Sequence, residues 1–152
     1  MKLKIPEFAL VVLIGASGSG KSTFAAKHFG PFETISSDFC RGLVSDDENS
    51  QAASKDAFDI VHAIAAKRLK NVRLTVIDAT NVQKYGRKSL VALAREYHAQ
   101  TGAIVLDVPE RVAVERNADR PDRNFGRRVV AQHRQQLKRS LSGLKREGFR
   151  RV

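Results

Sequence analysis

Cysteine is scarce and long apolar runs are missing in this chain, and each shortage excludes one class of protein. A single cysteine, Cys40, cannot form an internal disulfide, which favours a reducing, cytoplasmic setting. The apolar runs near the N-terminus, including residues 9–14, are too short for a secretory signal or a membrane-spanning helix. Repeats and low-complexity segments are also missing. We therefore expect a soluble protein with no membrane partner.

The composition fits one soluble globular domain, with 152 residues, 42% apolar and 28% charged. The net charge of +11 is uneven. Residues 1–100 hold 14 Lys and Arg against 10 Asp and Glu, a balance of +4, whereas residues 101–152 hold 13 against 6, a balance of +7. The basic C-terminal third indicates a polyanionic partner such as nucleic acid. A solvated basic helix face explains the charge equally well.

Apolar runs alternate with amphipathic segments along the chain, which predicts an α/β fold with a parallel sheet flanked by helices. The predicted strands cover residues 9–15, 32–38, 73–81 and 103–108. The predicted helices cover residues 21–30, 51–69, 87–97, a segment from 109, and 125–147, with a loop at 119–124. The helix at 51–69 has one apolar face: Ala57, Ile60, Val61, Ile64, Ala65 and Leu69. Ligands in such folds bind beyond the carboxyl ends of the strands.

A phosphate-binding loop follows the first predicted strand and matches G-x-x-x-x-G-K-[ST] in full: Gly15, Ala16, Ser17, Gly18, Ser19, Gly20, Lys21 and Ser22, followed by Thr23. Its glycines let backbone N–H groups turn toward an anion, beside the positive end of the next helix. Lys21 is expected to reach the β- and γ-phosphates of ATP, and the Ser22 hydroxyl to ligate Mg²⁺. The alternative is a flexible Gly/Ser-rich loop.

A carboxylate, Asp78, follows the apolar part of the strand predicted at 73–81. It can hold a water on Mg²⁺, or it can cap the next turn. We favour the metal role, because the fold already indicates a magnesium nucleotide. Thr80 and Asn81, which follow it, can contact phosphate or shape the loop.

The segment SSDFCRG follows the second predicted strand and places Asp38 three residues before Arg41, on one side of a helical turn. A kinase for a hydroxyl acceptor needs a carboxylate to orient and deprotonate that hydroxyl. It also gains from an arginine fork that binds an acceptor phosphate. The alternative is an N-cap aspartate with a local ion pair. Spacing alone leaves both interpretations open.

Three arginines lie in or shortly before the loop at 119–124: Arg116, Arg120 and Arg123. This pattern is typical of a helical lid that covers the phosphate donor and neutralises charge in the transition state. The alternative is an exposed charged turn. The helix after it is basic and can guide a nucleic-acid strand toward the cleft through Arg127, Arg128, Arg134, Lys138 and Arg139.

The histidines carry no metal-ligand spacing: His28, His62, His98 and His133 are scattered over predicted helices. We expect Cys40 to serve packing, and we assign no role to Gln51.

Five segments together resemble the kinase domain of bacterial polynucleotide kinase-phosphatases, within the family of 5′-OH polynucleotide kinases: GASGSGKST, ISSDFCRGLVSDDENSQ, VIDATNVQ, ERNADRPDR and GLKREGFR. The resemblance extends over residues 1–152 and keeps the order of phosphate-binding loop, D-x-x-R and arginine lid. It implies a transferase that moves the γ-phosphate of ATP to the 5′-hydroxyl end of RNA or DNA in nucleic-acid repair.

The resemblance also implies residue roles. Lys21 and Ser22 would bind the donor phosphates and Mg²⁺ (or Mn²⁺). Asp38 would be the general base, and Arg41 would hold the phosphate on the 3′ side of the acceptor. Arg116 would contact the donor phosphates from the lid, and so would Arg120 and Arg123.

The family further implies phosphatase and ligase-like domains and a methyltransferase partner. Those domains do not fit in this chain, so we expect residues 1–152 to be a kinase domain excised from a longer protein, without phosphatase activity.

Two rivals stay open: a small-metabolite kinase of the shikimate or gluconate type, and a nucleotide-binding module without acceptor chemistry. The positive charge and Arg41 disfavour the small-metabolite kinase. A module that only binds a nucleotide would not need the carboxylate of Asp38. No aromatic platform for bases stands out, so the sequence does not separate RNA from DNA acceptors.

Overall fold

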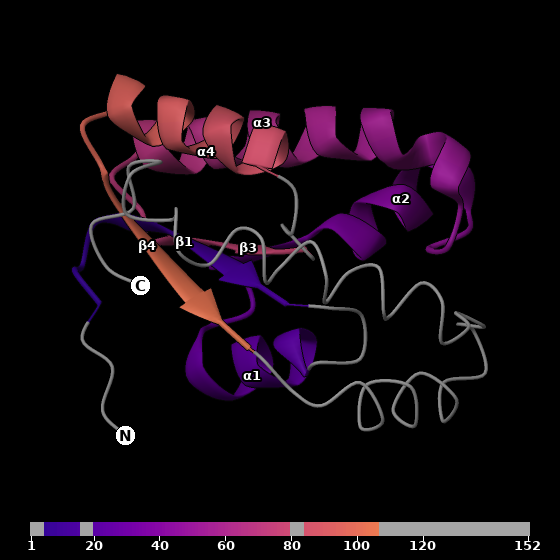
Figure 1. The fold of residues 1–152 in the computed structure, drawn as a ribbon, viewed down its shortest axis with the longest axis horizontal. Helices are drawn as coiled ribbons and strands as arrows, with labels where there is room; N and C mark the ends of the chain where they lie inside the picture. Colours follow the sequence, from indigo (N-terminus) through magenta and orange to yellow (C-terminus); the bar gives the residue numbers. More distant parts are fainter. Residues whose placement is uncertain (1–4, 16–19, 80–83, 107–152) are drawn as a thin grey trace.

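The computed structural model describes residues 5–15, 20–79 and 84–106 (Figure 1). Four strands and four α-helices, with one short 3₁₀ helix, alternate along this part of the chain. They are β1 (Ala9–Ile14), α1 (Lys21–His28), β2 (Thr34–Ser36), α2 (Ser37–Ser45), η1 (Gln51–Ala53), α3 (Ser54–Lys70), β3 (Thr75–Asp78), α4 (Lys84–Glu96) and β4 (Gln100–Val105).

The four strands form one parallel sheet in the order β2-β3-β1-β4. The central strand, β1, is an unbroken apolar run in which every residue is buried. A strand buried on both faces gains most by being apolar throughout, which is why this segment lacks the alternation of a surface strand. The predicted α/β class with a parallel sheet is confirmed.

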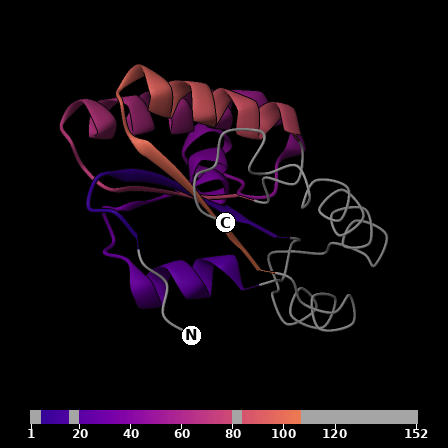
Figure 2. The ribbon, with the colours of Figure 1, turned by 60° about the vertical axis from the view of Figure 1, so that its left-hand side comes forward.

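Helices cover both faces of the sheet, with α1 on one side and α3 and α4 on the other (Figures 1 and 2). Alternate residues of β1 enter different layers. Val11 and Leu13 pack with Ala25 of α1, whereas Leu10 and Val12 join a larger core with residues of α3 and α4. Burial of these two apolar layers is the main stabilising contribution to the fold.

The order of the strands creates a switch point between β1 and β3. β1 leads into α1 on one face of the sheet, and the neighbouring β3 leads into α4 on the opposite face (Figure 1). The two connections therefore diverge where the carboxyl ends of these strands meet. In open α/β sheets this is the place where ligands bind.

Several predicted boundaries shift in the structure. The strand predicted at 103–108 begins earlier, as β4 at Gln100, and the segment predicted as a helix from residue 51 opens as η1 before α3. Ile64 was predicted to face the core but is 38% exposed. The buried stripe of α3 is narrower, and consists of Ala57, Val61, Ala65 and Leu69.

None of the helices in the described part of the chain is both long and apolar enough to cross a membrane. The helices and loop predicted beyond residue 106, including the basic residues at 127–139, lie outside the described residues.

Candidate active site

The two ends of the phosphate-binding loop are held together by Lys21. This residue opens α1, is only 9% exposed, and donates a hydrogen bond from Nζ to the carbonyl oxygen of Gly15 at 3.0 Å. Gly20 precedes it with φ of 95°, in the left-handed region that glycine adopts without a steric penalty. Ala16, Ser17, Gly18 and Ser19 lie outside the described residues.

The N-terminus of α1 is arranged to attract an anion. Its first turn has no acidic residue, and its N-cap, Gly20, offers no side-chain hydrogen bond. The partial positive charge of the helix end is therefore joined by the buried ammonium group of Lys21. These features fit the phosphates of a nucleoside triphosphate.

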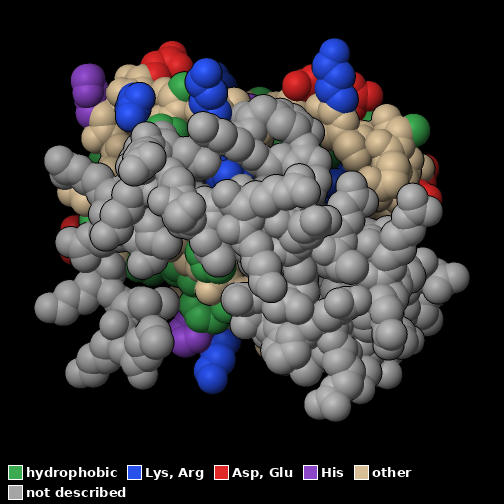
Figure 3. Space-filling view, in the orientation of Figure 1, with side chains coloured by type: hydrophobic (Ala, Val, Ile, Leu, Met, Phe, Trp, Pro, Cys, Tyr) green, Lys and Arg blue, Asp and Glu red, His purple; other side chains and the backbone are tan. Residues whose placement is uncertain are grey.

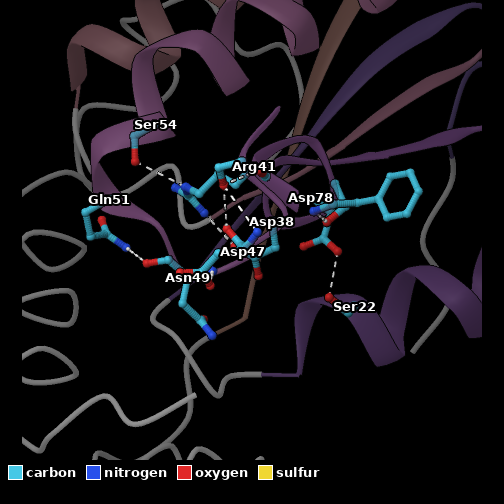
Figure 4. Close-up of polar contacts among 11 residues, drawn as sticks. Ser22, Asp38, Arg41, Asp47, Asn49, Gln51, Ser54 and Asp78 are labelled. Carbon is cyan, nitrogen blue, oxygen red and sulfur yellow. Dashed lines mark hydrogen bonds and ion pairs between the residues drawn. The ribbon is translucent and has the colours of Figure 1, made fainter. Parts of the chain in front are cut away.

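Ser22 and Asp78 meet across the switch point. Ser22 Oγ donates a hydrogen bond of 2.7 Å to Asp78 Oδ2, which joins the first turn of α1 to the last residue of β3 (Figure 4). Asp78 is nearly buried, with 6% of its surface exposed. A hydroxyl and a carboxylate this close form the hard oxygen pair that suits Mg²⁺, which usually takes one or two protein oxygens and completes its shell with phosphate and water. The residues present therefore fit the expected metal.

Asp38 and Arg41 form an ion pair on α2. The distance from Arg41 Nη1 to Asp38 Oδ1 is 2.6 Å, as expected for side chains three residues apart on a helix. The structure therefore contains the local ion pair of the alternative interpretation. Asp38 is not the N-cap residue that this interpretation also predicted. Ser36 caps the helix instead, because its side chain accepts a hydrogen bond from the backbone N–H of Phe39.

A third side chain completes this group. Arg41 Nε donates a hydrogen bond of 3.1 Å to Ser54 Oγ at the start of α3 (Figure 4). The side chain of Arg41 is 14% exposed and that of Asp38 is 28% exposed. Burial lowers the pKa of the Arg41 guanidinium, and the nearby Cys40 side chain, in its ionised thiolate form, offsets part of the decrease. An arginine starts so far above neutrality that it keeps its charge.

Asp38 and Asp78 belong to neighbouring strand ends. β2 pairs with β3 in parallel, with Ser36 opposite Asp78, and α2 begins directly after Ser36. The ion pair and the Ser22–Asp78 pair therefore lie along the same edge of the sheet (Figure 4). This arrangement places an anion-binding loop, a pair of metal-type oxygens and a carboxylate–guanidinium pair in one region. Groups of these kinds suit phosphoryl transfer to a hydroxyl.

The structure does not describe every residue proposed from the sequence. Thr80 and Asn81 lie outside the described residues, as do the three lid arginines, Arg116, Arg120 and Arg123. Thr23, next to Ser22, is exposed on α1. The roles of all of these residues stay predictions.

Cys40 is a core residue next to Arg41 in the chain, and His62 connects two helices. Cys40 is 2% exposed and belongs to the larger core, and burial raises the pKa of its thiol. His62 links α3 to α4 through hydrogen bonds to Phe58 O and Ser89 Oγ. Within the described ranges, no three His, Cys, Asp or Glu side chains gather as a metal-binding group.

Sequence reasoning missed two residues. Ser54 contacts Arg41 from 13 positions away, and no spacing rule connects the two. Arg87 is fully buried in α4, where a charged side chain breaks the expected apolar pattern. The only available hint was that Arg87 occupies a position three residues before the buried Leu90, on the same helix face.

On the face drawn in Figure 3, the described helices carry mixed charge. Lys and Arg side chains alternate with Asp and Glu side chains over the helices at the top of Figure 3. This pattern agrees with the modest balance of +4 for residues 1–100.

Solved structures similar to this chain include two of a Pnkp1/Rnl/Hen1 complex. One, described as an RNA repair complex, has 28% identity and a TM-score of 0.75, and the match covers 91% of this chain and 47% of the other. The second has 31% identity and a TM-score of 0.61, and covers 76% of this chain and 41% of the other. The chain thus spans less than half the length of these relatives. The resemblance to a polynucleotide kinase-phosphatase kinase domain is confirmed.

A gluconokinase from Sinorhizobium meliloti 1021 shares the fold at 16% identity, with a TM-score of 0.58 and coverage of 95% of both chains. No curated protein matches the chain. A family model described as an AAA domain matches residues 10–144. With its phosphate-binding loop, parallel sheet and P-loop kinase fold, the chain belongs to this AAA domain family.

Proposed function

We propose that this chain is an ATP-dependent polynucleotide kinase that transfers the γ-phosphate to the 5′-hydroxyl end of RNA or DNA. The observation that carries the proposal is the Asp38–Arg41 ion pair, which lies along the same sheet edge as the Ser22–Asp78 pair. The first pair suits a phosphorylated, hydroxyl-bearing acceptor, and the second suits a magnesium-bound donor. The similarity to chains of an RNA repair complex supports the same acceptor class.

On the donor side, Lys21 and the N-terminus of α1 bind and orient the phosphates of ATP. Ser22 would hold Mg²⁺ directly and Asp78 would hold it through a water. The metal would neutralise charge on the donor phosphates. Lys21 is already enclosed by protein, so its charge acts with little screening by water on the phosphoryl group in transit.

On the acceptor side, Asp38 aligns the 5′-hydroxyl and takes its proton as the oxygen attacks the γ-phosphorus. The bond from that phosphorus to the bridging oxygen of ADP breaks in the same displacement. Arg41 binds the phosphate on the 3′ side of the first nucleotide, which distinguishes a polynucleotide end from a small alcohol. Arg116, Arg120 and Arg123 cover the donor phosphates in this proposal.

The proposal extends to the setting of the reaction. The chain covers 47% and 41% of the Pnkp1/Rnl/Hen1 chains that it matches. We regard residues 1–152 as the kinase unit of a longer end-healing protein, whose phosphatase and ligase-like domains and methyltransferase partner act on the same broken ends.

A transfer assay tests the proposal directly. The protein would be incubated with γ-labelled ATP, Mg²⁺ and a 5′-OH oligonucleotide, beside Asp38→Ala and Asp59→Ala variants. Asp59 is an exposed carboxylate on α3 and serves as the matched control. We expect label on the oligonucleotide from the wild type and Asp59→Ala, and a loss of about 10²-fold or more with Asp38→Ala. The mechanism is wrong if Asp38→Ala transfers as well as wild type.

A salt titration separates this function from a small-metabolite kinase. The KM for a polynucleotide should rise steeply with salt, because binding releases counterions from the phosphate backbone. The KM for a small neutral acceptor should stay nearly constant over the same range. A flat response with the oligonucleotide would favour the small-metabolite kinase.

A further inference from the structure

We propose that Ser54 is a positioning residue for Arg41, and that it thereby sets the preference of the site for a phosphorylated acceptor. The inference rests on the proposed function, since it concerns the same acceptor site. It adds a residue that neither the sequence motifs nor the order of elements would single out.

Arg41 is held from two helices. Its Nη1 contacts Asp38 Oδ1 at 2.6 Å within α2, and its Nε donates to Ser54 Oγ at 3.1 Å on α3. Two contacts on different nitrogens fix both the position and the rotation of the planar guanidinium group. One contact alone would leave the plane free to rotate, at a cost in side-chain entropy whenever a ligand binds.

The pattern of contacts also selects which edge of the guanidinium can bind a ligand. Nε is committed to Ser54, so the edge formed by Nε and Nη2 is closed to a two-point contact with phosphate. Nη2 has no hydrogen-bond partner among the residues that the structure describes. An acceptor phosphate would therefore bind at the Nη2 end of the group, beside the nitrogen that holds Asp38. This geometry keeps the bound phosphate adjacent to the carboxylate that receives the hydroxyl proton.

Ser54 is not occupied with capping its own helix. The N-cap of α3 is Ala53, which makes no side-chain cap hydrogen bond, and Ser54 is the first helical residue. Its oxygen accepts from Arg41, and its hydroxyl hydrogen makes no bond within the described part of the chain. The hydroxyl thus has a donor left for a phosphate oxygen beside Arg41. The Oγ atom of Ser54 therefore both orients Arg41 and offers a hydrogen bond to the acceptor phosphate.

The test compares two acceptors that differ by one phosphate. KM and kcat would be measured for a nucleoside 3′-monophosphate and for the unphosphorylated nucleoside, using wild type, Ser54→Ala, Ser54→Thr and Ser50→Ala. Threonine keeps the hydroxyl. Ser50 lies four residues earlier, is half-buried, and its side chain makes no hydrogen bond within the described residues, so it is the matched control.

Ser54→Ala should raise the KM for the phosphorylated acceptor about tenfold, the size expected for losing a hydrogen bond to a charged group. The KM for the bare nucleoside and for ATP should change by less than about twofold, and Ser54→Thr should restore the wild-type value. Ser50→Ala should match wild type throughout.

Suppose that wild type labels both acceptors, so that the proposed function stands. Three outcomes would then contradict the role of Ser54. They are an unchanged KM in Ser54→Ala, an equal loss on both acceptors, and a Ser54→Thr variant as impaired as Ser54→Ala. If wild type labels neither acceptor, the inference falls together with the proposed function.

Discussion

Asp38 and Arg41 face each other at 2.6 Å, one turn apart on a helix that begins directly after β2. The pair joins the two groups that we assign to the acceptor, one for its hydroxyl and one for its phosphate. A change to either residue removes this ion pair from the other, whose charge is partly buried. Their effects on activity should therefore be coupled and should not add.

The first prediction concerns Arg41. Arg41→Ala should reduce kcat/KM about 10- to 100-fold more for a 3′-phosphorylated nucleoside than for the bare nucleoside, because only the former uses the guanidinium. Arg41→Lys should not restore the difference, since one ammonium cannot reach Asp38 and Ser54 as the fork does. Arg95→Ala, at an exposed arginine of α4, is the control. Equal losses on both acceptors would remove the phosphate-binding role.

The second prediction concerns the metal. Asp78→Asn should raise the Mg²⁺ concentration that gives half-maximal activity and lower the maximal rate, because the Ser22–Asp78 pair loses its negative charge. Asp59→Asn should leave the magnesium curve in place. The measurement is label transfer against Mg²⁺ concentration at fixed ATP. A curve for Asp78→Asn that overlays wild type would contradict the metal role.

The third prediction concerns stability. Arg87 is fully buried on α4 and engages in interactions there, whereas its neighbour Lys88 is exposed. Arg87→Ala should lower the free energy of unfolding by about 3 kcal/mol, as for other losses of a buried charged group. Lys88→Ala should change it by less than about 0.5 kcal/mol. Urea denaturation measures both, and similar values for the two variants would contradict the structural role of Arg87.

The fourth prediction concerns pH. Burial raises the pKa of the Cys40 thiol above its ordinary 9.0, and Arg41 offsets part of that increase. Because the folded state prefers the protonated thiol, this contribution to stability is complete below the pKa of the unfolded chain and is lost as pH rises toward that of the folded chain. The free energy of unfolding should therefore fall more steeply above about pH 9 in wild type than in Cys40→Ala. Parallel curves for the two proteins would show that the thiol is not responsible.

Local motifs were predictable from the sequence. The phosphate-binding loop is contiguous, and its requirements for glycine, lysine and serine follow from the backbone geometry of one turn. The structure accordingly places Gly20 in the left-handed region and Lys21 at the start of α1. Asp78 at the end of a buried strand was equally predictable, since an apolar run followed by a polar residue identifies the strand end.

Helix faces were less predictable. Periodicity assigned Ile64 to the core and gave no warning of a buried Arg87, yet Ile64 is 38% exposed and Arg87 is 0% exposed. Hydropathy describes the average preference of a residue type. The actual face depends on how α3 and α4 sit on the sheet and on the polar groups that each side chain can reach there.

For this protein, the sequence by itself determined the α/β class, the phosphate-binding loop and the identity of Asp38 and Arg41 as a pair within one helical turn. Only the tertiary structure decided the strand order that brings Ser22 to Asp78 and the contact that links Arg41 to Ser54. The physical reason is distance along the chain. Local geometry follows from neighbouring residues, whereas contacts over 13 or 56 positions arise only when the packing of helices on the sheet brings those side chains together.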